Sequence, residues 1–301
     1  MKKGKVLSFI ILLWAPLLVL AQNQQYAFRV LANKGTNEVK SGDTWQPLKT
    51  GVQLKVGDEL KISTNASVGL VSSSGKPLEV KEAKVHKVVD LLAKVGNSQS
   101  VLNKYTDFIL SSNSDEAKKR NRLSATGAVH RGTGDITIML PESQQAEVYN
   151  NTVIFSWQAV SSKAPFVVTF KNRFDEDLLK VETGDMKVEI DLNNPKFQNE
   201  SMLFVEVKSK EDGKGKSEQS VIKKITPKRQ EAVKADLGKL TDLSEETAFN
   251  KFILASFYEE NKLLIDAMTC YEQAIKLDAE NPTYKEAYEE FLIRNKLKKV
   301  K

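Results

Sequence analysis

The chain is poor in the side chains that carry out most protein chemistry. It has one cysteine and two histidines in 301 residues. A lone Cys270 cannot form a disulfide within the chain, and as a small semi-buried residue in a predicted helix it is best explained as core filler. His86 and His130 have no carboxylate or cysteine near them at metal-ligand spacing. We therefore expect no metal site and no cofactor.

Sequence motifs of the common enzyme classes are also missing. There is no glycine-rich phosphate loop, no serine nucleophile elbow and no His-x-Glu pattern. We expect a protein that is not an enzyme and assign no catalytic residue. A cell-wall hydrolase remains a less favoured alternative, because the two carboxylates of a glycosidase can meet in three dimensions without any sequence motif.

Neither sign of charge is in large excess. The chain carries 45 basic and 39 acidic residues, and the basic excess is small and interspersed, which argues against a nucleic-acid partner. One stretch, residues 111–135, is polar and basic. We interpret it as a solvated linker, although the same composition would suit an acidic partner or a lipid phosphate. Its basic residues are Lys118, Lys119, Arg120, Arg122 and Arg131.

The start of the chain is typical of an exported protein. Three lysines within the first five residues precede an apolar run over 6–20 that contains Pro16 and is followed by Ala21. The run is shorter than the roughly 20 residues that span a bilayer, so a cleaved signal peptide is favoured over an uncleaved anchor. We expect residues 1–21 to be the signal peptide, a periplasmic or cell-surface location, and membrane contact only before cleavage.

Short alternating apolar runs separated by glycine turns follow over residues 22–95, and they predict a small antiparallel β domain. This part resembles the FecR-like domain, which implies a periplasmic binding module and leaves open a sensory role in envelope signalling or uptake. The resemblance depends mainly on the segments Trp45-x-Pro47-Leu48-x-x-Gly51, Leu54-x-x-Gly57-Asp58-x-Leu60-x-Ile62 and Val88-x-Asp90-Leu91.

The next stretch, residues 96–134, is expected to hold an amphipathic helix within 97–110 and then the basic linker. Beyond it, seven apolar runs with turn signals over 135–226 predict a β-sandwich. With its Phe155-x-Trp157 step, this part resembles an immunoglobulin or fibronectin type III module. We expect Trp157 in the core and the acidic cluster 175–177 in a hairpin turn rather than a calcium site.

The last part, residues 227–301, has helical periodicity with a break at 261–263. Ser244 is a plausible N-cap for the first of two helices, and Asn281-Pro282 would open another. The pattern resembles one tetratricopeptide repeat, although Ala279 stands where that family usually has proline. The residues that carry the resemblance are Leu254, Ala255, Tyr258, Ala267, Tyr271 and Ala274.

These predictions give a multi-domain protein with mainly β N-terminal and central modules and an all-α C-terminal helical hairpin unit. A single repeat cannot bury its own apolar face, so residues 227–240, the β modules or a partner must cover it. We expect a non-catalytic envelope scaffold that binds a protein partner, and β modules that stay folded without residues 228–301. The hypothetical partner-binding residues are Phe252, Phe257, Tyr258, Tyr284 and Tyr288.

Overall fold

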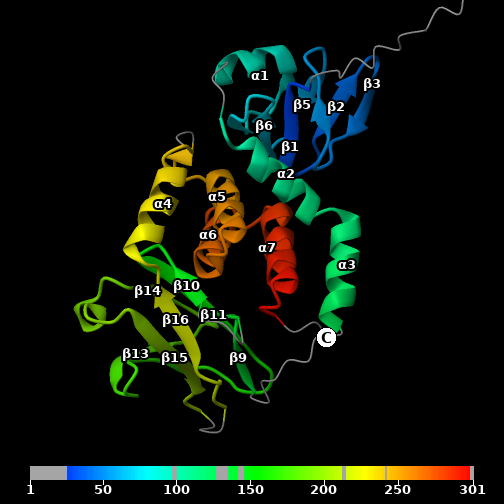
Figure 1. The fold of residues 1–301 in the computed structure, drawn as a ribbon. Coiled ribbons are helices and arrows are strands. Elements are labelled where there is room, and N and C mark those ends of the chain that lie inside the picture. Colours follow the sequence, from blue (N-terminus) through cyan, green and yellow to red (C-terminus); the bar gives the residue numbers. More distant parts are fainter. Residues whose placement is uncertain are drawn as a thin grey trace, which may run out of the picture.

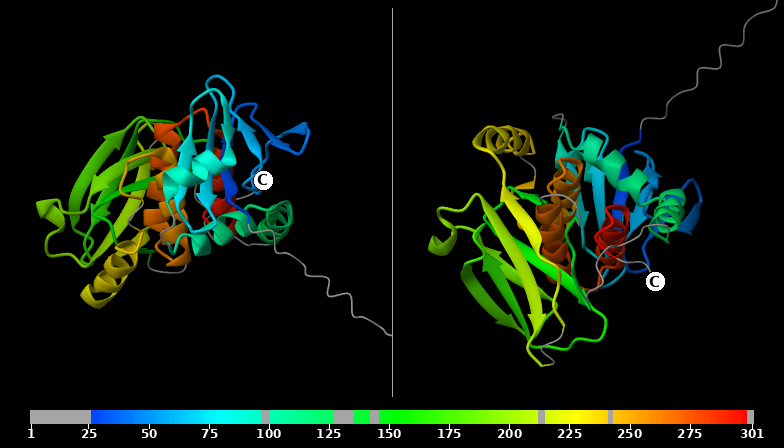
Figure 2. Two further views of the ribbon diagram at one scale, coloured as in Figure 1. Left: turned by 90° about the horizontal axis from the view of Figure 1, so that it is seen from above. Right: turned by 60° about the horizontal axis from the view of Figure 1, so that its bottom comes forward.

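The computed structural model describes residues 26–96, 100–126, 135–141, 146–211, 215–240 and 243–298. The expected signal peptide and His130 lie outside these ranges. Two β modules, one N-terminal and one central, flank a group of helices (Figures 1 and 2). The expected order of mainly antiparallel sheets followed by C-terminal helices is confirmed. Within the described part of the chain, no helix is long and apolar enough to cross a membrane.

The first β module contains two four-stranded antiparallel sheets, ordered β4-β1-β6-β7 and β3-β2-β5-β8. Because side chains alternate along a strand, Val39 and Leu60 pair on the buried face of the second sheet while Trp45 lies on its outer face. The strands are β1 (Phe28–Lys34), β2 (Glu38–Ser41), β3 (Thr44–Pro47), β4 (Gln53–Leu54), β5 (Glu59–Lys61), β6 (Ser67–Ser72), β7 (Pro77–Val80) and β8 (Val85–Lys87).

Three helices follow: α1 (Val88–Val95), α2 (Asn103–Ser112) and α3 (Asp115–Thr126). The amphipathic helix that we expected corresponds to α2, whereas the linker prediction is wrong for the residues of α3. Local signals for α3 exist, since the Ser114 hydroxyl accepts the Ala117 N–H at 3.2 Å and two acidic residues occupy the first turn. The helix α3 has few apolar residues, so the search for helical periodicity did not detect it.

The second β module consists of a five-stranded sheet, ordered β10-β16-β15-β12-β13, and a three-stranded sheet, ordered β14-β11-β9. The sheets face each other, with ring centroids 5.6 Å apart for Trp157 and Phe166 and 5.8 Å apart for Phe155 and Phe170. Trp157 is therefore in the core, as expected. The strands are β9 (Ile136–Ile138), β10 (Ala146–Val148), β11 (Thr152–Ala159), β12 (Phe166–Lys171), β13 (Asp177–Thr183), β14 (Lys187–Asp191), β15 (Met202–Ser209) and β16 (Ser220–Lys224).

Two local predictions for the second β module can be compared directly with the structure. The acidic cluster lies in the turn between β12 and β13, where Asp175 has a φ of 65° and pairs with Lys171 at 2.9 Å. The hairpin prediction is confirmed there. The described residues of this module form eight strands where the sequence predicted seven, because β10 consists of Ala146-Glu147-Val148, which has no large apolar side chain to mark it. A single-turn 3₁₀ helix, Pro195–Phe197, precedes β15.

Four helices form the C-terminal part: α4 (Pro227–Leu237), α5 (Ala248–Glu260), α6 (Leu264–Leu277) and α7 (Pro282–Arg294). The N-cap of α5 is Thr247 rather than Ser244, since the Thr247 hydroxyl accepts the Asn250 N–H at 3.1 Å. Asn281 caps α7 as predicted. The break between α5 and α6 also lies where the periodicity placed it.

The helices α5, α6 and α7 lie between the two β modules (Figure 1). Thr269 of α6 accepts the Ile154 N–H of β11 at 2.9 Å, and Thr283 of α7 accepts the Asn33 N–H of β1 at 3.2 Å. Gly69 in β6 has to be a glycine, because a Cβ atom there would collide with the Phe249 ring of α5. The helical unit is thus packed against strands on both sides.

Candidate functional site

The five aromatic residues expected to line a partner groove lie inside the protein. Phe252, Phe257, Tyr258 and Tyr284 are each 5% exposed or less, and Tyr288 is partly buried. All five belong to the large core cluster or pack against it. In this structure they stabilise the interior of the chain, so they do not form an open groove.

Other parts of the same chain provide the cover for these aromatic side chains. The ring of Phe257 meets that of Tyr105 from α2 at 5.5 Å, and the ring of Tyr258 meets that of Tyr149, just after β10, at 6.2 Å. The Tyr258 hydroxyl donates to Asn150 Oδ1 at 3.4 Å. Burial raises the pKa of Tyr258 well above its usual value. The apolar face of α5 is therefore covered by other parts of the same chain.

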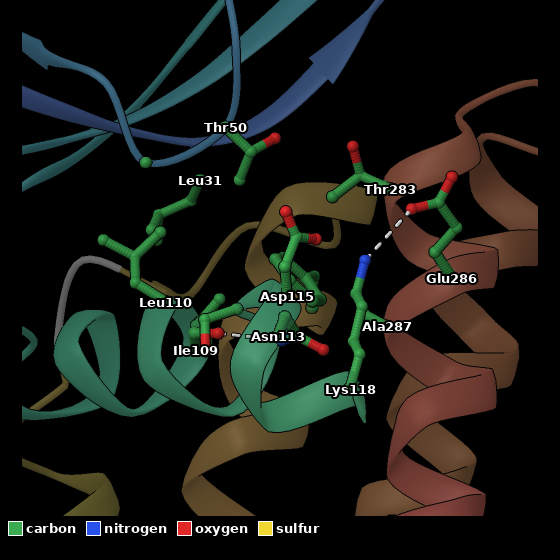
Figure 3. Close-up of a pocket in the computed structure, with 13 residues that line it drawn as sticks. Leu31, Thr50, Ile109, Leu110, Asn113, Asp115, Lys118, Thr283, Glu286 and Ala287 are labelled. Carbon is green, nitrogen blue, oxygen red and sulfur yellow. Dashed lines mark hydrogen bonds and ion pairs between the residues drawn. The ribbon is translucent and has the colours of Figure 1, made fainter. Parts of the chain in front are cut away.

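An open cavity of about 400 Å³ lies where the first β module, the corner between α2 and α3, and the helices α5 and α7 meet (Figure 3). We call it the junction cavity. Of the five predicted residues only Phe252 lines it. Its apolar lining is formed by Leu31, Ile109, Leu110, Phe252 and Ala287, and its polar lining by Thr50, Gly51, Asn113, Ser114, Asp115, Lys118, Thr283 and Glu286.

Regular secondary structure holds the walls of the junction cavity in place. Leu31 is fully buried at an irregularity in the pairing of β1 with β6. Gly51 has a φ of 89° and donates its N–H to the Val30 carbonyl at 2.8 Å, which fixes the turn before β4 against β1. On the opposite side, Thr283 is bonded to Asn33. The cavity is therefore preformed by elements far apart in the sequence.

The charges of the junction cavity come from two helices. Lys118 of α3 lies 3.6 Å from the Glu286 carboxylate of α7, and this pair crosses the cavity (Figure 3). Asp115, one turn earlier on α3, forms no ion pair with any residue that the structure describes. The lining thus has two carboxylates and one ammonium group above an apolar floor. This combination suits a ligand that has both an apolar and a cationic group.

Two residues of the basic segment, Lys118 and Arg122, form ion pairs with carboxylates of α7. Arg122 contacts the buried Glu290 carboxylate at 3.3 Å, four residues after the contact of Lys118 with Glu286. Arg122 is itself largely exposed. Such partly exposed ion pairs contribute on the order of 0–1 kcal/mol each. The helix α3 is therefore held weakly, mainly by buried alanines and these pairs.

The remaining chemically active side chains show structural roles. Burial raises the pKa of the Cys270 thiol to about 12, so this thiol stays protonated. The Nε2 atom of His86 is hydrogen-bonded to the Glu82 carbonyl oxygen at 2.8 Å. Within the described residues, no group of three or more histidine, cysteine, aspartate or glutamate side chains is placed to hold a metal ion.

Comparisons with known proteins do not add a family. No protein-family model matches the chain, and no curated protein matches it. The junction cavity and the packing around it are therefore interpreted from their own geometry. Sequence reasoning missed the cavity, because its lining residues are spread between positions 31 and 287, and the few that had been named, such as Lys118 and Phe252, were assigned to different parts of the chain.

Proposed function

We propose that the protein is a non-catalytic, exported binding and scaffold protein of the bacterial envelope. In this proposal its helical unit holds two β modules in one fixed arrangement, so that their outer faces contact a protein partner together. The observation that carries the proposal is a cluster of buried residues that continues from the second β module through the helices to Leu31, Ala32 and Val71 of the first β module. The other core residues of the first module form a cluster of their own. A continuous apolar contact of this kind opposes independent movement of the modules.

The strand order of the second β module supports an immunoglobulin-like or fibronectin-like assignment. In such modules strands A, B and E lie in one sheet, and strands C, F and G lie in the other. Here β9, β11 and β14 lie together, and β10 pairs parallel to the final strand β16. Modules of this architecture are common in proteins that bind other proteins outside the cytoplasm.

A tetratricopeptide-like assignment of the helical unit is supported by its small residues. Ala255, Ala267 and Ala274 are completely buried between α5 and its neighbours, as expected where two helices approach closely. The third helix, α7, follows in the position of a capping helix. In this proposal the helical unit stabilises the chain from inside. The β modules cover the helix faces that neighbouring repeats would cover in a repeat array.

The FecR-like proposal for the first β module is supported by the role of Asp58. Its side chain accepts the Ser41 hydroxyl at 2.8 Å and the Lys55 N–H at 2.7 Å. The Gly57-Asp58 step therefore shapes the turn that joins two sheets. A motif that builds the scaffold in this way is consistent with a binding module whose contacts are made by other, exposed residues.

Exposed aromatic residues give the proposal a surface on each β module. Trp45 on β3 is 36% exposed, and Phe174 in the turn after β12 is 69% exposed. Aromatic side chains are enriched at protein interfaces. Pro47 has no N–H group and blunts the free edge of β3. A partner at Trp45 would therefore contact the face of the sheet rather than extend it by another strand.

The proposal is tested by affinity capture with residues 22–301 from isolated native envelopes. We expect one protein to be retained saturably, and Trp45→Ala or Phe174→Ala to weaken its retention at least about tenfold. Val160→Ala is the matched control, since Val160 is an exposed apolar residue elsewhere on the second module. The proposal would be contradicted if the unmutated chain captured no protein saturably, or if the pure chain cleaved cell-wall fragments. Capture of an inner-membrane protein would favour the FecR-like sensory role.

A further inference from the structure

We propose that the junction cavity binds a protein segment in which a large apolar side chain adjoins a lysine or arginine. This inference rests on the proposed binding function and adds to it a specific surface and the chemistry of the partner. The site is separate from the exposed aromatic residues of the two β modules. It is carried by the size of the cavity, by its apolar floor and by the distribution of charge around it.

The size and floor of the cavity fit one large apolar side chain. About 400 Å³ is at the lower end of ligand pockets, which range over roughly 300–1,000 Å³. Leu31, Ile109 and Phe252 contribute to the floor from β1, α2 and α5. These three side chains are 2% exposed or less, and Leu110 is the partly exposed member of the apolar lining. An aromatic or large aliphatic group that enters would therefore cover Leu110 and lie above the buried floor, where an anchor residue of an interface is shielded from water.

The charge around the cavity favours a cationic group next to the apolar side chain of the bound segment. Lys118 already faces the Glu286 carboxylate at 3.6 Å, whereas Asp115 has no ion-pair partner among the described residues. In the view of Figure 3, Asp115 lies between Leu110 and the Lys118–Glu286 pair. An ammonium or guanidinium group could pair with Asp115, while an anionic ligand would meet two carboxylates and one lysine.

The position of the cavity makes a flexible protein segment a suitable occupant. Its walls come from the first β module and from α2, α3, α5 and α7, so they are preorganised and little ordering is needed on the protein side. A bound segment would contact the β module and the helical unit together. A free aromatic amine has the same chemistry, so the test must separate this source from a peptide.

The experiment uses the mature chain and three dipeptide probes, with binding followed by NMR chemical-shift changes. The probes are N-acetyl-Phe-Lys-amide, N-acetyl-Phe-Glu-amide and N-acetyl-Ala-Lys-amide, with phenethylamine as the free-amine comparison. We expect the Phe-Lys probe to bind at least about tenfold more tightly than each of the others. The shifts should be centred on Leu110 and Ala287. Tighter binding of phenethylamine than of Phe-Lys would overturn the assignment to a protein segment.

Two neighbouring carboxylates provide a matched pair of variants. Asp115 lines the cavity, whereas Glu116 lies next to it in the first turn of α3 outside the lining. Asp115→Lys should abolish the preference for Phe-Lys over Phe-Glu, and Glu116→Lys should retain it. Both changes alter the charge near the helix N-terminus equally, so circular dichroism of the two variants controls for loss of α3.

The outcomes separate this inference from the proposed function. Equal binding of all probes, equal effects of Asp115→Lys and Glu116→Lys, or shifts confined to other surfaces would overturn it. If the envelope partner is still captured through Trp45 or Phe174, only the cavity assignment fails. Leu110→Ala, which changes the apolar lining without touching a charge, should weaken Phe-Lys binding while leaving Ala-Lys binding unchanged.

Discussion

Asp266 gives a direct test of how α6 is held against the second β module. Its side chain is completely buried, and its carboxylate accepts the Asn150 N–H at 2.7 Å and the Tyr149 N–H at 3.0 Å. Burial raises the pKa of Asp266 to about 7, although these two hydrogen bonds oppose the shift. The carboxyl group of the folded protein therefore changes its charge near neutral pH.

The sign and size of the effect on stability follow from this pKa. The unfolded chain ionises Asp266 near 3.8. Between about pH 4 and pH 7 the unfolded state therefore binds fewer protons at this site than the folded state does. Proton linkage then requires that the free energy of unfolding falls as the pH rises through this window. At about 1.4 kcal/mol per pH unit, the difference between the two pKa values corresponds to ~4 kcal/mol.

The assay is urea unfolding of the mature chain and of Asp266→Asn at pH 4 and pH 8. We expect the wild type to lose ~4 kcal/mol relative to Asp266→Asn between these pH values, because asparagine cannot ionise. Asp236→Asn is the control, since Asp236 lies on α4 with an exposed side chain. If the wild type instead gains stability relative to Asp266→Asn as the pH rises, the two backbone hydrogen bonds outweigh burial and the reasoning is refuted.

Three further predictions concern the helices. Removing residues 228–301 should unfold or aggregate the second β module, whose core continues into the helices, whereas most of the core of the first β module is a separate cluster; retention of the full native near-UV circular dichroism would contradict this. Arg294→Met should lower the free energy of unfolding by about 3–5 kcal/mol, because it leaves the buried Glu259 carboxylate without its 2.6 Å partner, as urea unfolding would measure. Amide exchange in α3 should accelerate between 0.1 M and 1 M salt if the Arg122–Glu290 pair helps to hold it; an unchanged rate would exclude that role.

Sequence reasoning succeeded where local chemistry decides the structure. The strand β12, Phe166–Lys171, lies in the region where the sequence predicted a β-sandwich; β15 and β13 flank it in the sheet, and four of its six residues are buried. Asn281 and Pro282 start α7 because a cap and a preset φ favour a helix regardless of its surroundings. Such features need few long-range contacts. They can therefore be predicted from one sequence.

The features that the sequence did not predict depend on long-range contacts. The helix α3 has little apolar periodicity, and its place in the structure depends on contacts with α7 that no local pattern encodes. The strand β10 is three residues long and depends on its partner β16. The junction cavity depends on both kinds of information, since Leu31 and Ala287 meet only after the β module docks on the helices. The capping signal at Ser114 and the two acidic residues in the first turn of α3 are the local signals for that side of the site.

The interpretation of the aromatic helix faces shows why periodicity alone cannot separate a binding groove from a core. An amphipathic face must be covered, but the pattern is the same whether the cover is a partner or the rest of the chain. Here the cover can be identified: β1 lies beside α7, β11 beside α6, and Gly69 makes room for Phe249. These contacts use the faces of the helices that the sequence analysis assigned to a partner. The proposed function therefore places binding on the exposed aromatic residues of the β modules, and the further inference places it in the junction cavity.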